Sequence, residues 1–202
     1  MRSLFPTKAI RDMVVREFKA IEGGNQNIDK FEEQLVLMSK DQFTLSREFD
    51  APRDLVWKVY TEAEHLAKWW GPQGFKMVKA EVDLRPGGLF HYCMQSPDGH
   101  EMWGRFVYRD VTAPERVIFT NSFSDKEGNA VRAPFNPNWP LEVMNFVTLT
   151  EKNGKTTITM KGAPFNANEE ESKLFTSMQP MLDQGFKGTF DQLDAYLKSV
   201  KQ

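Results

Sequence analysis

Cysteine and histidine are scarce in this chain, and long apolar runs are missing from it. Its 202 residues include one cysteine, Cys93, and three histidines. A single cysteine excludes an internal disulfide and a zinc site built from several thiolates, so an oxidising compartment is not indicated. No apolar stretch approaches the roughly 20 residues that cross a bilayer, and the N-terminus does not resemble a signal peptide. We therefore expect a cytoplasmic protein without a membrane partner.

An excess of one charge is also lacking. The 26 basic and 28 acidic side chains leave a formal net charge of -2, and lysine and arginine are nowhere concentrated into a surface that would follow phosphates. We expect no nucleic-acid partner. What the composition does hold is ten methionines and 12% aromatic residues. Flexible thioethers and flat rings fill irregular apolar space and also line adaptable pockets.

The length suits one core-bearing domain with a modest appendage. Residues 1–40 show helical periodicity broken at Gly23-Gly24, and they are predicted to form an N-terminal helical extension. Residues 41–202 form the main domain in this interpretation. The apolar stripe of the extension suits packing on its own domain or on a second subunit, so a homodimer stays open.

Alternating apolar and polar residues predict about seven strands. The predicted strands are residues 43–49, 75–84, 89–94, 100–109, 115–123, 141–150 and 155–161. Turns such as Pro86-Gly87-Gly88 and Pro97-Asp98-Gly99 are short, so consecutive strands must pair antiparallel. Residues 124–140 hold several prolines and exceed the length that a hairpin needs. This segment either covers a site or is a surface insertion.

Helical periodicity appears in two further regions. Residues 53–61 and 62–70 form two short pieces that end at Gly71-Pro72. Asn168 precedes three acids, which suits the positive end of a helix, and a broad apolar stripe then runs from Pro180 to about Lys198. A curved sheet is the only large apolar surface available to that stripe. The predicted fold class is therefore α+β, with a curved antiparallel sheet wrapped on a long C-terminal helix.

Two neighbouring strands and the last helix present large apolar side chains on one face each. The candidate ligand-binding residues are Phe90, Tyr92, Met94, Met102, Phe106, Met181, Gly185 and Phe186. Facing one another, these residues would enclose soft apolar space with one tyrosine hydroxyl, which is typical of a ligand site. Gly104 and Gly185 lack side chains and favour incomplete filling. A solidly filled core is the alternative.

Groups suited to catalysis are sparse. His91 and Cys93 lie on the same face of one strand, but no third group is identified to orient a base. No two histidines have metal-ligand spacing on one helix, and a phosphate-binding glycine loop and a nucleophile elbow are missing from the sequence. We therefore predict no catalytic residue, no metal and no cofactor, and we lean toward a protein that is not an enzyme.

Several short motifs together resemble a known family. They are Arg47-Glu48-Phe49-Asp50-Ala51-Pro52-Arg53, Val56-Trp57, Thr61-Glu62-Ala63-Glu64-His65-Leu66, Trp69-Trp70-Gly71-Pro72 and Pro86-Gly87-Gly88. This combination is similar to the signature of proteins related to the activator of heat-shock chaperone ATPase, within the START-like helix-grip superfamily. The match runs from about residue 43 to residue 198. The N-terminal helices and the proline-containing segment 124–140 depart from the family pattern.

The resemblance implies a helix-grip fold with a cavity between the sheet and the last helix. It divides the functional expectation, because the family includes small-molecule binders, resistance proteins that sequester a toxic compound, a chaperone-stimulating domain and members without known activity. As a hypothesis, Trp70 at the end of its short helix reaches this cavity and joins the predicted ligand-binding residues.

Three functions are carried forward as hypotheses. The leading one is noncatalytic binding of a hydrophobic or aromatic small molecule. The second is stimulation of a chaperone ATPase, which rests on the resemblance alone; it ranks lower because the activator's additional chaperone-binding domain is not recognisable in residues 1–40. The third is a cyclase or hydrolase that uses Tyr92, His91 or an acidic residue at the cavity mouth as acid or base.

Overall fold

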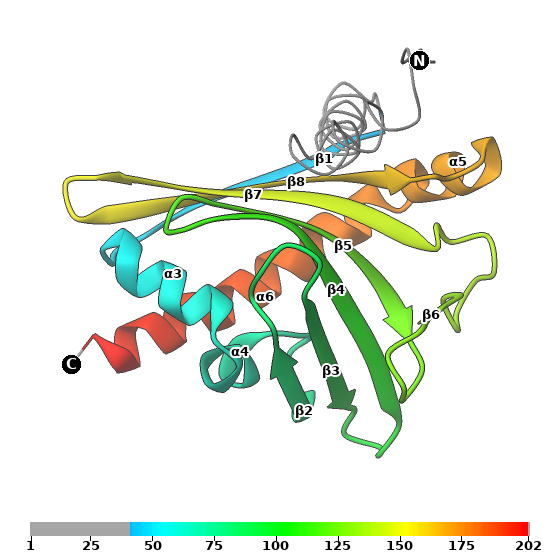
Figure 1. Ribbon diagram of the computed structural model, residues 1–202, viewed down its shortest axis with the longest axis horizontal. Coiled ribbons are helices and arrows are strands. Elements are labelled where there is room, and N and C mark those ends of the chain that lie inside the picture. The colour runs from blue at the N-terminus through cyan, green and yellow to red at the C-terminus, as the bar shows by residue number, and fades with distance from the viewer. Residues whose placement is uncertain (1–40, 202) are drawn as a thin grey trace, which may run out of the picture. The chain divides into compact units, whose positions relative to one another are not determined.

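The computed structural model describes residues 41–201, and the predicted helical extension over residues 1–40, with its part in a homodimer, lies outside the described residues (Figure 1). The strands are β1 (Phe43–Phe49), β2 (Lys76–Val82), β3 (Leu89–Gln95), β4 (Glu101–Thr112), β5 (Arg116–Ser124), β6 (Ala130–Val131), β7 (Glu142–Lys152) and β8 (Lys155–Phe165). The helices are α3 (Arg53–Thr61), α4 (Ala63–Trp69), α5 (Glu169–Ser177) and α6 (Gln179–Val200). The predicted α+β class is confirmed.

All strands of the described residues pair antiparallel in one sheet of order β1-β8-β7-β5-β4-β3-β2, with β6 paired to β5. Each of the seven strands predicted from alternation is present. The eighth, β6, was missed because a strand of two residues is too short to show a period. It lies within the predicted loop over residues 124–140.

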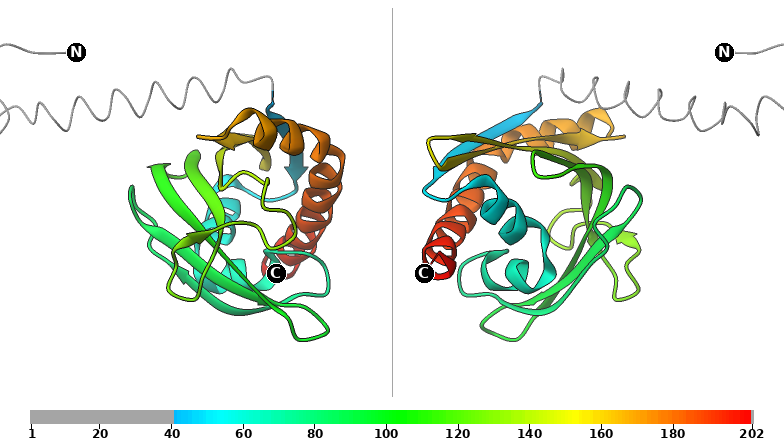
Figure 2. Two further views of the ribbon diagram at one scale, coloured as in Figure 1. Left: turned by 90° about the vertical axis from the view of Figure 1, so that its right-hand side faces the viewer. Right: turned by 60° about the vertical axis from the view of Figure 1, so that its left-hand side comes forward.

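The sheet curves around α6, which lies across its concave side, while α3 and α4 close one end (Figures 1 and 2). The residues that α6 buries are Thr189, at its middle, and Phe190, Leu193 and Leu197 in its C-terminal half. Phe190 meets Phe49 of β1 edge-on, with ring centroids 5.6 Å apart. The C-terminal half of α6 therefore fixes the helix to the sheet. Each helix between residues 41 and 201 is too short or too polar to traverse a bilayer.

The segment over residues 124–140 packs on the domain through a chain of aromatic rings. Phe135 lies 5.7 Å from Phe123 of β5 and 5.7 Å from Trp139, and Trp139 lies 5.3 Å from Phe175 of α5. At its start, α5 is closed by a capping box in which Asn168 accepts from the Glu171 backbone. The segment is thus tied to α5 and to the end of the sheet.

The contact between Phe190 and Phe49 yields a stability prediction. Phe190→Ala should lower the free energy of unfolding by about 3–5 kcal/mol, because the ring is fully buried and its removal leaves a cavity. Met181→Ala, on the same helix at a side chain that is 65% exposed, should change it by less than about 0.5 kcal/mol. Urea unfolding of both variants measures the difference. Similar losses would show that α6 is not held at its C-terminal half.

Candidate functional site

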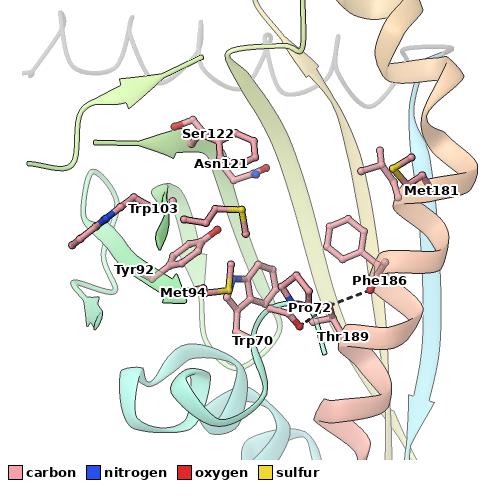
Figure 3. A pocket seen from close by; sticks show the side chains of 16 residues that line it. Trp70, Pro72, Tyr92, Met94, Trp103, Asn121, Ser122, Met181, Phe186 and Thr189 are labelled. Atoms are coloured by element: carbon pink, nitrogen blue, oxygen red, sulfur yellow. Dashed lines mark hydrogen bonds between the residues drawn. The ribbon is translucent and has the colours of Figure 1, made fainter. Parts of the chain in front are cut away.

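A pocket of about 310 Å³ lies between the concave face of the sheet and the N-terminal half of α6 (Figure 3). We call it the helix pocket. Its lining residues are Trp70, Gly71, Pro72, Tyr92, Met94, Met102, Trp103, Gly104, Asn121, Ser122, Phe123, Met181, Leu182, Gly185, Phe186 and Thr189. The sheet walls come from β3, β4 and β5, and the short turn after α4 supplies Trp70 to Pro72. No lining residue carries a formal charge.

Most of the residues predicted from the sequence meet in this pocket. Those that line it are Trp70, Tyr92, Met94, Met102, Met181, Gly185 and Phe186. Phe90 and Phe106 are buried beneath, where Phe106 stacks on Phe119 with ring centroids 4.2 Å apart. They support the wall from behind, and Trp70 stands edge-on to Phe106 at 5.2 Å. A ligand-binding role for any of these residues stays a prediction.

Gly104 and Gly185, which were expected to leave empty volume in the pocket, lie in different surroundings. A Cβ placed on Gly185 would meet nothing within 4 Å, so this position opens onto free space as expected. A Cβ on Gly104 would lie 2.4 Å from the hydroxyl oxygen of Tyr92, its cross-strand partner. The expectation that Gly104 leaves volume is wrong. An aromatic side chain from the neighbouring strand covers a glycine of this kind and fills the space.

Three polar groups give the helix pocket hydrogen-bonding capacity. The Asn121 side-chain oxygen accepts from Nδ2 of the buried Asn145 at 2.7 Å, and Asn145 also donates to the Val143 carbonyl at 3.0 Å. These bonds orient Asn121 with its own NH₂ group available for an acceptor. The indole N–H of Trp70 is buried and makes no well-aligned hydrogen bond.

The third polar group is the Tyr92 hydroxyl. Burial raises the pKa of Tyr92 from 10.0 to about 12, and the nearby indole N–H of Trp70 acts in the opposite direction. At neutral pH this hydroxyl is therefore protonated, and it serves as a hydrogen-bond donor or acceptor. A neutral phenol with a raised pKa is a poor general base.

The other groups considered for catalysis lie elsewhere. His91 and Cys93 alternate with the pocket-facing residues of β3 and occupy the opposite face of the sheet. There His91 Nε2 contacts the Asp125 carbonyl oxygen at 3.1 Å, and its Nδ1 lies 3.3 Å from Lys79 Nζ. Burial, with a smaller contribution from Glu101, raises the pKa of the Cys93 thiol. Neither residue lines the helix pocket.

One constellation of potential metal ligands was missed by reasoning on histidine spacing alone. In the described residues, Glu62, Glu64 and His65 bring one ligand atom each within 4.8 Å of one another. The two carboxylates are exposed, and His65 Nδ1 lies 2.8 Å from the Tyr196 hydroxyl. The signal in the sequence was the close run of two glutamates and a histidine. This cluster stands outside the helix pocket.

The fold and the pocket define a helix-grip domain that carries an apolar pocket under its last helix. The family described as "Activator of Hsp90 ATPase homolog 1-like protein" matches residues 50–198, and the chain belongs to this family. The resemblance stated from the motifs is confirmed.

Solved structures agree with this assignment. Protein NE0264 of Nitrosomonas europaea is 28% identical with a TM-score of 0.65, over 81% of this chain and 99% of that chain. Protein Ms6760 of Mycobacterium smegmatis is also 28% identical, with a TM-score of 0.63, over 79% and 92% of the two chains. The AHSA1 (SPO3351) protein of Silicibacter pomeroyi shares the fold at 18% identity and a TM-score of 0.60, over 80% and 99%. No curated protein matches the chain.

The different surroundings of the two glycines predict opposite effects of one substitution. Gly104→Ala should destabilise the protein by about 1–3 kcal/mol, because the new methyl group collides with the Tyr92 ring. Gly185→Ala should stabilise it by up to about 1 kcal/mol, because alanine favours the helix and the position is open. Urea unfolding of both variants tests this. Equal effects of the same sign would contradict the assigned surroundings.

The raised pKa of Tyr92 predicts that the free energy of unfolding depends on pH in the alkaline range. Its pKa is higher in the folded state than its ordinary value of 10.0, so its contribution to stability is complete below pH 10 and is lost as pH rises toward about 12. Tyr92→Phe has no proton to release, and its unfolding free energy should fall less steeply above pH 10. Burial also raises the pKa values of Tyr60 and Tyr108, so part of the slope persists. Unfolding free energies are measured in urea at each pH. If they fell equally steeply above pH 10 in the wild type and in Tyr92→Phe, a buried Tyr92 hydroxyl would be ruled out.

Proposed function

We propose that this protein binds a neutral hydrophobic or aromatic small molecule in the helix pocket and does not transform it chemically. The observation that carries the proposal is the pocket itself, about 310 Å³ of space under α6 whose lining includes no charged residue. This volume is at the lower end of the range of about 300–1,000 Å³ that is usual for small-molecule sites.

The composition of the wall supports a neutral ligand. An ion placed there would lose its hydration, and no lining side chain offers an opposite charge in return. A flat apolar body would instead contact Trp70, Phe186 and the thioethers of Met94 and Met102, which adapt to irregular shapes. The free NH₂ group of Asn121 favours a ligand that carries a hydrogen-bond acceptor.

The exposed residues on the N-terminal half of α6 give a small molecule access to the helix pocket from solvent. The N-terminal half of α6 contacts β1, where the Phe186 ring stacks on Phe43 at 5.4 Å, but the Met181 side chain on this half is 65% exposed. Leu182 and Phe186, which face the pocket from the same half, are only partly buried. A small molecule can therefore reach the pocket along the N-terminal half of α6 while the C-terminal half stays packed.

The family match supports a second candidate, stimulation of a chaperone ATPase. That function would use the outer surface of the domain and would not depend on the volume of the helix pocket. ATPase measurements with a cytosolic heat-shock chaperone, with and without this protein, separate the two candidates. A Gly185→Leu variant that stimulates as well as the wild type would place this activity outside the pocket.

The binding proposal predicts stabilisation by a suitable probe. Near 100 times its Kd, 2-naphthol should stabilise the folded protein by about 2.7 kcal/mol. In a protein of this size, that corresponds to a rise in Tm of about 5–10 °C. Naphthalene-2-sulfonate has the same rings and a negative charge, and it should bind at least about tenfold more weakly, because no cation lines the pocket.

The matched variants are Gly185→Leu and Gly188→Leu. A Cβ at either position meets nothing within 4 Å, so both variants should fold, but only Gly185 lines the pocket. Gly185→Leu should abolish the shift caused by 2-naphthol, and Gly188→Leu should retain it. Unchanged binding by Gly185→Leu, or no shift of the wild type with either compound, would refute the proposal.

A further inference from the structure

The amide of Asn121 is held in one orientation in the wall of the helix pocket. Asn145, on the neighbouring strand β7, is 3% exposed, and its Nδ2 donates to the Val143 carbonyl oxygen at 3.0 Å. A backbone carbonyl oxygen can only accept, so this contact fixes which end of the Asn145 amide carries the NH₂ group. The same Nδ2 donates to the Asn121 side-chain oxygen at 2.7 Å. The oxygen of Asn121 is therefore turned toward Asn145.

The NH₂ group of Asn121 is the free end of this chain of hydrogen bonds. Within residues 41–201 it donates to no protein group, and it is not one of the unpaired polar groups that the protein seals from water. Asn121 lines the helix pocket, and Figure 3 shows it on the sheet side, facing α6. A bound molecule without an acceptor would cover this donor and leave it unpaired, at a cost in affinity.

A second donor, the Tyr92 hydroxyl, is a neighbour of Asn121 on the sheet. Tyr92 pairs with Gly104 of β4 and lies over it, since a Cβ on this glycine would collide with the hydroxyl oxygen. Gly104 in turn pairs with Phe123 of β5, two residues from Asn121 on the same face. Diagonal neighbours on adjacent strands lie about 7–8 Å apart, within reach of long side chains. The ring thus carries its hydroxyl across β4 toward Asn121.

The contact of Tyr92 with Trp70 directs the hydroxyl proton. The indole N–H of Trp70 lies near the hydroxyl oxygen and opposes the rise in the pKa of Tyr92 that burial causes. An indole nitrogen only donates, so it occupies the acceptor side of the hydroxyl and leaves the O–H proton for another partner. In the part of the chain that the structure describes, no protein group accepts this proton, and the hydroxyl is not sealed from the pocket.

A carbonyl oxygen matches these two donors better than a hydroxyl or a charged group does. It has two lone pairs and no proton, whereas a ligand hydroxyl placed there would bring a third proton toward the two donors. A carboxylate would accept from both donors, but no cation lines the pocket to offset the loss of its hydration. Trp70 and Phe186 supply flat apolar contacts for an aromatic body.

We propose that the helix pocket selects neutral aromatic carbonyl compounds, such as aryl ketones, and that Asn121 determines this selectivity by donating from Nδ2 to the carbonyl oxygen. The Tyr92 hydroxyl is placed to donate to the second lone pair of the same oxygen. Asn145 keeps the oxygen of Asn121 from turning toward the ligand. This inference rests on the proposed function and adds to it the chemical class of the ligand.

The test compares 2-acetylnaphthalene with 2-isopropenylnaphthalene, in which a CH₂ group replaces the carbonyl oxygen and the shape is nearly the same. Kd values of both compounds and of 2-naphthol are measured by calorimetry for the wild type, Asn121→Leu and Asn138→Leu. Asn121→Leu keeps the size of the side chain, and Asn145 retains its bond to Val143, so this variant should fold. Asn138 is exposed and lies outside the helix pocket, which makes Asn138→Leu the matched control.

Asn121→Leu should lower the ratio of the hydrocarbon Kd to the ketone Kd about 3- to 10-fold, the usual effect of one hydrogen bond. It should still bind 2-naphthol, and Asn138→Leu should leave the ratio unchanged. The infrared carbonyl band of the bound ketone should lie at lower frequency in the wild type than in Asn121→Leu, because a hydrogen bond weakens the C=O bond. An unchanged ratio or an unchanged band, with 2-naphthol still bound, would overturn carbonyl selection and leave the proposed function intact.

If the wild type binds none of the three compounds, both proposals fall. Asn121→Asp provides a second variant in case Asn121→Leu does not fold, because a carboxylate oxygen can still accept from Asn145. Its other oxygen replaces the NH₂ group and repels the ketone oxygen. At alkaline pH, where the carboxyl group is ionised, the ratio should therefore fall at least about tenfold. Equal ratios for Asn121→Asp and its control Asn138→Asp would refute the role of Asn121.

Discussion

Phe190 packs edge-on against Phe49 at 5.6 Å, and this contact anchors α6 to the sheet. The rest of the apolar stripe on α6 depends on it. The N-terminal half of α6 also contacts β1, where the Phe186 ring stacks on Phe43 at 5.4 Å, and the helix pocket lies between this half and strands β3, β4 and β5. At Gly185 a Cβ would meet nothing within 4 Å, so no side chain fills the helix pocket at this position. One continuous stripe thus serves as core at one end and as pocket wall at the other.

Much of this arrangement follows from local patterns in the sequence. Alternation along β3 and β4 correctly places Tyr92 and Met94 on the concave face with Met102, and the stripe on α6 needs a sheet to cover it. These inferences require only the period of a strand or helix and the rule that apolar faces are buried. They hold because the neighbouring elements are joined by short turns, which restrict the possible pairings.

What the sequence does not specify is how cross-strand neighbours share space. Gly104 suggests a void, but Tyr92 of the adjacent strand covers it; its ring and not a ligand fills that volume. Phe106 alternates correctly but sits behind Trp70, because the turn after α4 folds the indole over it. The pairing of β6 with β5 depends on the path of residues 124–140, whose irregular chain has no period from which a position could be read.

The turn after α4 couples the two walls of the helix pocket. The Gly71 carbonyl oxygen accepts hydrogen bonds from Thr189 Oγ1 at 3.3 Å and from Gln192 Nε2 at 2.7 Å, both on α6. On its other side, a Cβ at Gly71 would lie 2.3 Å from the sulfur of Met94 on β3. With φ at +118°, this position requires glycine for its backbone as well as for space. A single residue therefore sets the distance between sheet and helix beside Trp70, which links the width of the pocket to the anchoring of α6.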